Sequence, residues 1–306
     1  MIIDLPDTTT TAVNRALVRV REEGGAVALG RVLTLVIDAQ DGDVEDAVKA
    51  ANEASREHPC RVIVLARDET RTTARLDAEI RVGGDAGASE VIVLRVSGEM
   101  LEHSDTLVIP LLLPDAPIVA WWPQEVPQTP ASHPIGRMAQ RRITDSTACS
   151  DPMRTLRRLR DGHKGGDTDL AWTRLTVWRG LLAAALDLPP HEPVTRVEVR
   201  GHESHPSVVL LAAWLAYALD CPVDLVRLKD VQAITRVELH RPSGPIIIDR
   251  PDGRTATLSQ PGQPERHTSM PIRGLRECLA EELRRLDPDE VYSEVLDSGL
   301  DRIGAA

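Results

Sequence analysis

Apolar and polar residues follow two different periods along the first 123 residues, which predicts helices and strands in alternation. Apolar positions recur on one helical face at 12–23, whereas short β-branched runs at 32–37 and 61–65 are typical of buried strands. With the helix between them, which Asp43 could cap, these runs form a β-α-β unit. The expected elements are helices at 12–23, 44–57 and 100–107 and strands at 32–37, 61–65, 76–82, 90–96 and 117–122.

The second half of the chain repeats the mixture of helices and strands. A stripe through Ala171, Leu175, Trp178, Leu182 and Ala185 predicts one long helix at 170–186, and the helix at 205–219 is apolar almost all round. Turns of the Pro-Ser-Gly and Pro-Asp-Gly type separate the later strands. The expected strands lie at 194–199, 224–228, 234–240, 246–249 and 254–258, and closing helices at 275–286 and 289–296.

A Pro-rich stretch and an Arg-rich helix connect the two halves. Pro123, Pro127, Pro130 and Pro134 each break regular hydrogen bonding, and Asp151 with Pro152 caps and starts a helix at 153–161. A polar link at 162–168 marks the boundary. The sequence therefore predicts an α/β fold with mixed sheets in two domains, 1–165 and 166–306.

Charge and cysteine usage narrow the class of protein. The chain of 306 residues carries 47 acidic and 36 basic residues, a net charge of −11, which disfavours a general nucleic-acid or anionic-membrane binder. The four cysteines are widely spaced without a CxxC motif, as expected of reduced thiols. Residues 1–7 lack a signal-peptide pattern, and no apolar run is long enough to span a bilayer. We expect a soluble, cytoplasmic protein.

Motifs of catalysis and cofactor binding are missing. The sequence contains no GxxxxGK[ST], GxGxxG or GxSxG motif, and the cluster Gly83, Gly84 and Gly87 precedes a strand, which favours a hairpin. His202, Glu203 and His205 lack metal-ligand spacing, and Ser204 or His205 is better placed as a helix cap. We therefore predict no catalytic residues, no cofactor and no metal.

An Arg-rich segment at 136–160 stands out within the acidic chain. Its first part could bind a phosphate or an acidic partner surface, because guanidinium forks suit both. The alternative is a solvated surface with internal Arg–Asp pairs, which we favour for the later helix. Both interpretations stay open for the first part, whose candidate residues are Arg137, Arg141, Arg142, Asp145 and Ser146.

Four of the five tryptophans lie in two short clusters. Trp121 and Trp122 must point to opposite faces of their strand, so that one is expected in the core and the other free for the Pro-rich connection or a partner. Trp178 belongs to the apolar helix stripe, whereas Trp172 shares another face with Arg179. An exposed Trp beside Arg is typical of an interface hot spot. Trp121, Trp122, Trp172, Arg174 and Arg179 are thus further candidates for partner contact.

Several short motifs, in order along nearly the whole chain, resemble one family. They are Trp121-Trp122-Pro123, His133-Pro134-Ile135-Gly136, Arg141-Arg142-Ile143-Thr144-Asp145-Ser146, Asp169-Leu170-Ala171-Trp172-Thr173-Arg174, Trp178-Arg179-Gly180, Ser204-His205-Pro206-Ser207 and Leu286-Asp287-Pro288-Asp289-Glu290-Val291-Tyr292. In this order they resemble the OpcA-type glucose-6-phosphate dehydrogenase assembly proteins of actinobacteria and cyanobacteria.

The resemblance implies a non-catalytic partner of glucose-6-phosphate dehydrogenase, the NADP-dependent entry enzyme of the oxidative pentose phosphate pathway. Such a protein would promote assembly of the dehydrogenase or activate it allosterically, by direct contact. In cyanobacterial relatives the role is linked to thiol redox control. We do not assign this property to the present chain, because its cysteines form no paired motif. The alternative is a sugar-phosphate or nucleotide-binding protein, perhaps a minor enzyme, that uses Arg141 and Arg142 as an anion site.

Overall fold

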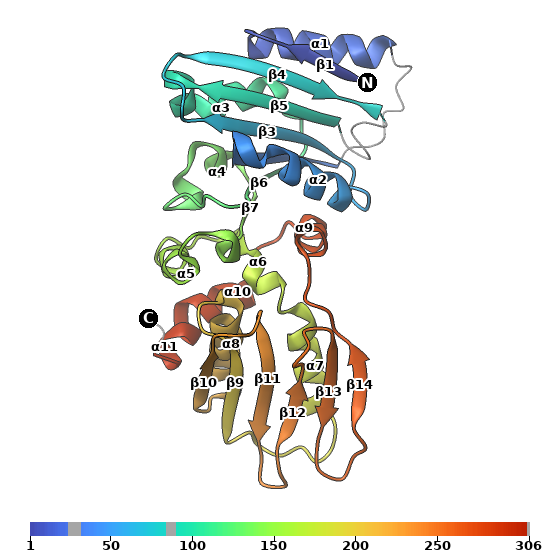
Figure 1. Ribbon diagram of the computed structural model, residues 1–306, viewed down its shortest axis with the longest axis vertical. Coiled ribbons are helices and arrows are strands. Elements are labelled where there is room, and N and C mark those ends of the chain that lie inside the picture. The colour runs from blue at the N-terminus through green and yellow to red at the C-terminus, as the bar shows by residue number, and fades with distance from the viewer. Residues whose placement is uncertain (24–31, 84–89, 305–306) are drawn as a thin grey trace. The chain divides into compact units, whose positions relative to one another are not determined.

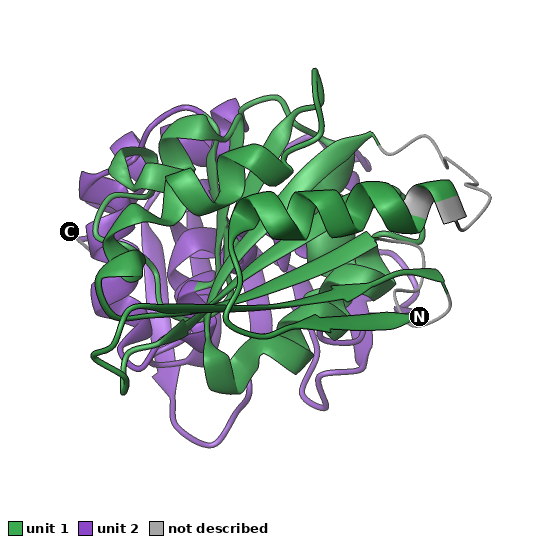
Figure 2. Ribbon diagram, turned by 90° about the horizontal axis from the view of Figure 1, so that it is seen from above, with its two compact units in different colours: residues 1–145, 166–168, 275–288 green, residues 146–165, 169–274, 289–306 purple. Residues whose placement is uncertain are grey.

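The computed structural model describes residues 1–23, 32–83 and 90–304, and the chain divides into two compact α/β units (Figure 2). Unit 1 comprises residues 1–145, 166–168 and 275–288, and unit 2 comprises 146–165, 169–274 and 289–306. These ranges differ from the predicted boundary between residues 165 and 166. The Arg-rich helix α5 (Pro152–Asp161) packs on α8 (Pro206–Leu219) in unit 2, whereas α9 (Leu275–Arg284) packs on α2 (Val44–Ala54) in unit 1.

Unit 1 is built on a mixed sheet which, within the described residues, has eight strands in the order β1-β4-β5-β3-β2-β6-β7-β8 (Figure 1). The central strands run parallel, while β4 pairs antiparallel with β5 and β1. The strands are β1 (Ile2–Leu5), β2 (Leu33–Gln40), β3 (Cys60–Asp68), β4 (Arg75–Arg81), β5 (Glu90–Ser97), β6 (Ile118–Trp122), β7 (Arg141–Thr144) and β8 (Asp167–Asp169).

The strand order reverses at β2, which defines a doubly wound sheet. From β2 the chain moves outward through β3 to β5, then returns to place β6 and β7 on the other side of β2. In such sheets, ligands bind outside the carboxyl ends of the strands where the order reverses. A ligand site in this unit is therefore expected at the carboxyl ends of β2 and β6.

Helices cover both faces of this sheet. One face carries α1 (Thr10–Glu23), α3 (Ser104–Val108) and α4 (Pro134–Met138), whose apolar residues join the β3, β4 and β5 side chains in one core. On the other face, α2 contacts β2, β3 and α9. Helix α4 lies close to the preceding turn, because a Cβ on Gly136 would stand 1.8 Å from the Pro130 carbonyl oxygen, so only glycine fits there.

Unit 2 holds a second sheet, six-stranded within the described residues, in the order β10-β9-β11-β12-β13-β14. β10 runs parallel to β9 and the remaining pairs are antiparallel. The strands are β9 (Arg196–His202), β10 (Val223–Leu228), β11 (Ile234–His240), β12 (Ile246–Asp249), β13 (Thr255–Ser259) and β14 (Arg266–Ser269).

The buried helix α8 forms the centre of the unit 2 core, as its apolar sequence predicts. Its start is capped by His205, whose side chain accepts a hydrogen bond from the Ser207 N–H, as expected. The other helices are α6 (Leu170–Thr173), α7 (Thr176–Leu186), α10 (Glu290–Glu294) and α11 (Leu300–Arg302), with a π-helical turn at Val295–Gly299.

Most predicted elements are confirmed within a few residues, with three corrections. The single helix predicted at 170–186 is broken into α6 and α7, because the Leu175 N–H bonds the Trp172 carbonyl in a tight turn. Asp43 precedes α2 but makes no side-chain capping bond. The segment around Arg141 is a buried strand, β7, rather than part of a surface patch. The turn predicted at Gly84 and Asp85, and with it Gly87, lies outside the described residues.

Candidate functional site

At the carboxyl edge of the unit 1 sheet, where β2, β3 and β6 end, polar side chains of the unit contact one another. Arg67 at the end of β3 forms ion pairs of 2.8 Å with both Asp38 and Glu125. Gln40, the last residue of β2, donates a 2.9 Å hydrogen bond to the same Glu125 carboxylate. These contacts bridge the place where the strand order reverses.

Asp38 is the buried centre of this network. The Trp122 indole N–H donates to Asp38 over 3.2 Å, and His133 Nε2 lies 3.6 Å from the same carboxylate oxygen. The His133 ring also stands edge-on to Trp122, with ring centroids 5.4 Å apart. Burial raises the pKa of Asp38, an effect that the Arg67 charge partly offsets. Asp38 and Arg67 were not candidates in the sequence, although a polar residue closing an apolar strand is the signal that could have found them.

The pKa of His133 lies below its ordinary value of 6.5, chiefly because the ring is buried. The positive charges of Arg67 and Arg137 lower this pKa further, whereas the negative charges of Asp38 and Asp105 raise it. The unfolded chain therefore binds a proton more readily than the folded chain. We expect the free energy of unfolding to fall as the pH drops below about 6.5, by up to about 1.4 kcal/mol per pH unit. Urea denaturation between pH 5.5 and 7.5 measures this effect.

His133→Gln is expected to flatten that pH dependence, whereas His103→Gln, at an exposed position in the turn Gly98–His103, should retain it. If wild type and His133→Gln lose stability in parallel on acidification, another group carries the effect.

The chain between β2 and α2 does not fit a dinucleotide. In doubly wound dehydrogenases this turn is rich in glycine, and the pyrophosphate rests on the N-terminus of the following helix. Here Asp41 and Asp43 lie in the turn, and Glu45 and Asp46 lie in the first turn of α2. Asp41 pairs with Arg95 and Glu45 with Arg81, and the acidic side chains around this turn disfavour a bound pyrophosphate.

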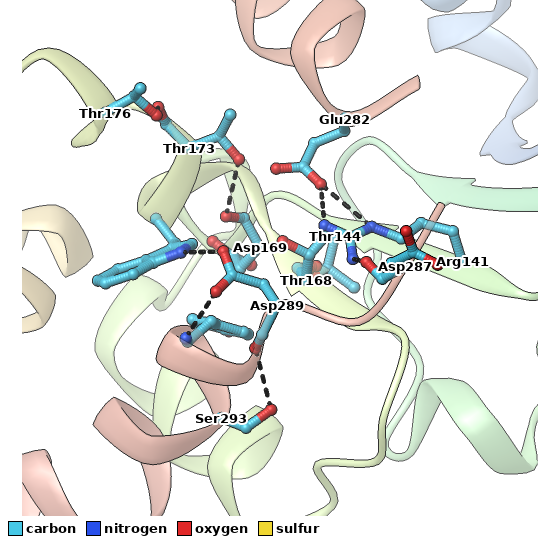
Figure 3. A network of polar contacts seen from close by, with 12 residues as sticks. Arg141, Thr144, Thr168, Asp169, Thr173, Thr176, Glu282, Asp287, Asp289 and Ser293 are labelled. Carbon is cyan, nitrogen blue, oxygen red and sulfur yellow. Dashed lines mark hydrogen bonds and ion pairs between the residues drawn. The ribbon is translucent and has the colours of Figure 1, made fainter. Parts of the chain in front are cut away.

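Arg141 and Arg142, on β7, are both buried, and they connect this strand to other segments of unit 1. Arg141 bonds Glu282 through Nε at 3.2 Å and Nη2 at 2.5 Å, and donates to the Asp287 carbonyl at 2.7 Å (Figure 3). Arg142 pairs with Asp167 and donates to the Ala139 carbonyl at 2.8 Å. Both guanidinium groups therefore already have carboxylate partners.

The next two candidates are also buried. Asp145 is 3% exposed and is the last residue of the first segment of unit 1. Ser146, in unit 2, donates both its N–H and its hydroxyl to Asp169, at 2.9 and 2.7 Å. Asp169 in turn caps α6 by accepting from the Ala171 N–H. Through Asp169, Ser146 is therefore connected to the start of α6 and helps to position it.

Trp172 is enclosed within unit 2 and is only 1% exposed, so the expectation of an exposed ring is wrong. Its indole N–H donates to Asp289 at 2.8 Å, and its face carries Arg179, whose guanidinium carbon lies 3.8 Å from the ring centroid. Asp289 also caps α10, accepting from the Tyr292 N–H at 2.9 Å, and its carbonyl bonds the Ser293 hydroxyl (Figure 3). The Tyr292 ring completes the cluster, 5.7 Å from Trp172.

Three of the ten candidates keep accessible surface. Arg137 is exposed, and Arg174 and Arg179 are half-buried. Trp121 and Trp122 are both buried, and Trp122 contacts His133 of the Pro-rich connection, which is one of the two roles expected for the second ring. Neither ring is exposed to a partner. The reason is that helices cover both faces of the unit 1 sheet, which the pattern of one strand does not reveal.

Other reactive groups are dispersed over the described residues. Cys60 and Cys278 are buried, Cys149 and Cys221 are partly buried, and all four are unbridged. Burial also raises the pKa of the Cys221 thiol, which disfavours the reactive thiolate. Within residues 1–23, 32–83 and 90–304, no group of three or more His, Cys, Asp or Glu is arranged to hold a metal ion. The same ranges contain no helix with the length and apolar character needed to cross a membrane.

Two family descriptions match consecutive parts of the chain. Residues 51–161 match the glucose-6-phosphate dehydrogenase subunit N-terminal domain, and residues 165–296 match the C-terminal domain of the same subunit. The chain belongs to the OpcA-type family of glucose-6-phosphate dehydrogenase subunits. Membership agrees with the resemblance carried by the ordered motifs.

Curated relatives with the name OpcA include proteins of Synechococcus elongatus and Synechocystis. The chain is 28% identical to the OxPP cycle protein OpcA of Synechococcus elongatus over 58% of its length and 43% of the relative's. It is 25% identical to the OpcA protein of Synechocystis over 67% of its length and 46% of the relative's. The chain thus spans less than half the length of the curated relatives that it matches.

Among solved structures, the fold is similar to an oxidoreductase from Sinorhizobium meliloti. The TM-score is 0.50 at 11% identity, and the match covers 90% of this chain and 96% of the other. At this identity the likeness concerns the fold alone.

Proposed function

We propose that this chain is a non-catalytic subunit that promotes the assembly of glucose-6-phosphate dehydrogenase, or activates it, through direct contact. The observation that carries the proposal is the match of residues 51–161 and 165–296 to the two domains of a glucose-6-phosphate dehydrogenase subunit. The name of the cyanobacterial relatives places them in the OxPP cycle, in line with a role in the oxidative pentose phosphate pathway.

The geometry of unit 1 supports a non-catalytic role. The carboxyl edge of its doubly wound sheet is bridged by Arg67, Asp38 and Glu125, and the turn before α2 carries acidic residues where a pyrophosphate would bind. A chain with this arrangement has a dehydrogenase-like sheet without a suitable dinucleotide site. We place it in the cytoplasm, in line with its unbridged cysteines.

The alternative, an anion site at Arg141 and Arg142, gains no support from the geometry. A sugar phosphate or nucleotide would have to displace Glu282 from Arg141 or Asp167 from Arg142, and both pairs are buried. Breaking such a pair leaves an uncompensated buried charge. We therefore infer that these two residues stabilise the fold rather than bind an anion.

The test combines the full chain with the dehydrogenase of the same organism. We expect the two proteins to co-elute in size-exclusion chromatography, and the dehydrogenase to gain activity or a larger oligomeric state when the chain is present. Activity is measured at several glucose 6-phosphate concentrations, which separates an effect on KM from one on kcat. If the proteins elute separately and neither kinetics nor oligomeric state changes, the proposal fails.

Charge reversal at an exposed candidate tests where contact occurs. Among the predicted contact residues of unit 1, Arg137 is the exposed one, so Arg137→Glu is expected to weaken co-elution without unfolding the chain. Arg56→Glu is the matched control, because Arg56 is also an exposed arginine of unit 1. Equal weakening by both variants would indicate a general charge effect rather than contact at Arg137.

A further inference from the structure

A cavity of about 300 Å³ lies in unit 2 and is lined in part by the turn that joins β12 to β13. Its polar lining comes from two neighbouring segments, the chain entering β11 and the β12–β13 turn. A smaller adjoining cavity shares Arg250 with it. Charged side chains line both cavities: Arg250, Arg254, Asp230 and Asp252 in the larger one and Arg174, Arg250 and Arg273 in the smaller one.

Arg250 is a buried cation whose hydrogen-bond partners, within the described residues, are neutral carbonyl groups. It is 4% exposed, and its Nη1 and Nη2 donate to the carbonyls of Met270 at 3.2 Å and Ile234 at 2.9 Å. Its guanidinium carbon lies 5.0 Å from the centre of the Trp178 ring, and its buried Nε has no hydrogen-bond partner among the described residues. Arg141 and Arg142, in contrast, are each paired with a carboxylate.

The acid nearest to Arg250 in the turn serves another purpose. Asp252 accepts hydrogen bonds from the backbone N–H groups of Arg254 and Thr255, both at 2.8 Å, and thereby shapes the turn. Its charge offsets only part of the effect of burial, which lowers the pKa of Arg250. Since an arginine stays protonated in proteins, a full positive charge remains in the wall of the cavity.

The wider lining of the two cavities is also basic. Four guanidinium groups line them, those of Arg174, Arg250, Arg254 and Arg273, against the two carboxylates of Asp230 and Asp252. Arg254 is exposed, which leaves it accessible to a molecule in the larger cavity. An anion bound here would compensate the buried charge that unit 2 itself leaves unpaired.

We propose that this cavity binds a small phosphorylated metabolite, whose phosphate is held between Arg250 and Arg254. A phosphate monoester carries more negative charge than a carboxylate and matches the forked donors of more than one guanidinium. A cavity of about 300 Å³ is at the lower end of the range for small-molecule sites, which suits a ligand the size of a sugar phosphate. The site differs from the one predicted at Arg141 and Arg142 and adds a ligand to the proposed function.

Isothermal titration of the full chain at constant ionic strength tests this site, with inorganic phosphate, a hexose 6-phosphate, the unphosphorylated hexose and acetate as ligands. We expect both phosphates to bind, and the hexose and acetate to bind much more weakly. Arg254→Ala should weaken phosphate binding about ten-fold or more, because it removes a charged hydrogen-bond donor. Arg266→Ala is the matched control, since Arg266 is exposed and pairs with Leu258 toward the opposite end of β13. It should bind as wild type does.

Arg250 itself is tested by two variants. Arg250→Met removes the buried charge and should abolish phosphate binding, whereas Arg250→Lys keeps the charge and should retain part of it. If either variant fails to fold, as judged by circular dichroism, the exposed Arg254→Ala variant decides. The proposal is overturned if wild type binds no phosphate at about 10 mM, if acetate binds as tightly as phosphate, or if Arg254→Ala and Arg266→Ala behave alike. The titration uses the chain alone, so its failure would leave the contact with the dehydrogenase untouched.

Discussion

Replacing Arg141 by alanine is expected to lower the free energy of unfolding by about 3–5 kcal/mol, as for other buried ion pairs that lose one partner. Arg141 is 3% exposed, and its guanidinium connects β7 to Glu282 of α9 and to the Asp287 carbonyl. Its removal would leave the Glu282 carboxylate buried without this partner. Urea denaturation, followed by circular dichroism, measures the change through the transition midpoint at unchanged slope.

Helix α9 offers its own control for this prediction. Arg284, two residues after Glu282, pairs with Glu57 at 2.7 Å, but both side chains are more than half exposed. Arg284→Ala is therefore expected to lower the free energy of unfolding by less than about 1 kcal/mol. Similar losses in the two variants would show that burial does not set the strength of these pairs, contrary to our account of Arg141.

Trp172→Ala is expected to destabilise the chain by about 3–5 kcal/mol, because a large buried ring is lost and a cavity is left behind. The ring packs within 5.7 Å of Tyr292, lies under Arg179 and donates its N–H to Asp289. Trp172→Phe keeps most of the ring but not the donor. It should cost about 1–3 kcal/mol, the penalty of a buried Asp289 oxygen that loses its partner.

The nearby Val177→Ala variant provides the comparison at an exposed position. Val177 is 40% exposed on α7, and its truncation should change the free energy of unfolding by no more than about 0.5 kcal/mol. Since Trp172 is buried, weaker binding of the dehydrogenase by Trp172→Ala should appear only together with lost stability. A Trp172→Ala chain that is as stable as wild type yet no longer binds would instead make Trp172 a contact residue.

In the sheet of unit 1, sequence patterns predict the long apolar strands but not the short ones. The apolar runs that end in Ile37 and Leu65 and the pair Trp121-Trp122 located β2, β3 and β6 within a few residues. The same patterns missed the short strands β1, β7 and β8. In β7 the reason is that the strand begins with two arginines, which are typical of a polar surface. Only the pairing of β7 with β6 reveals that these arginines are buried.

The candidate residues show a second limit of sequence reasoning. Arginine and tryptophan side chains near each other in sequence resemble a docking surface, yet their partners lie far along the chain. Arg141 and Glu282 are 141 positions apart, and Trp172 and Asp289 are 117 positions apart. No local pattern contains such contacts. Arg250 was not a candidate in the sequence, because an arginine before a Pro-Asp-Gly turn looks like an ordinary exposed residue.

The sequence by itself determined the α/β class, most helices and strands, and the ordered motifs that match the OpcA family, because periodicity and short motifs are local properties of the chain. The tertiary structure decided which charges are buried and paired. It showed Arg141 and Trp172 bound to acids of their own unit, and Asp38 paired with Arg67 at the carboxyl edge of the unit 1 sheet. It also showed Arg250 bonded to two carbonyls, with no ion pair among the described residues. Burial and pairing depend on residues brought together from distant parts of the chain, so they follow from the fold alone.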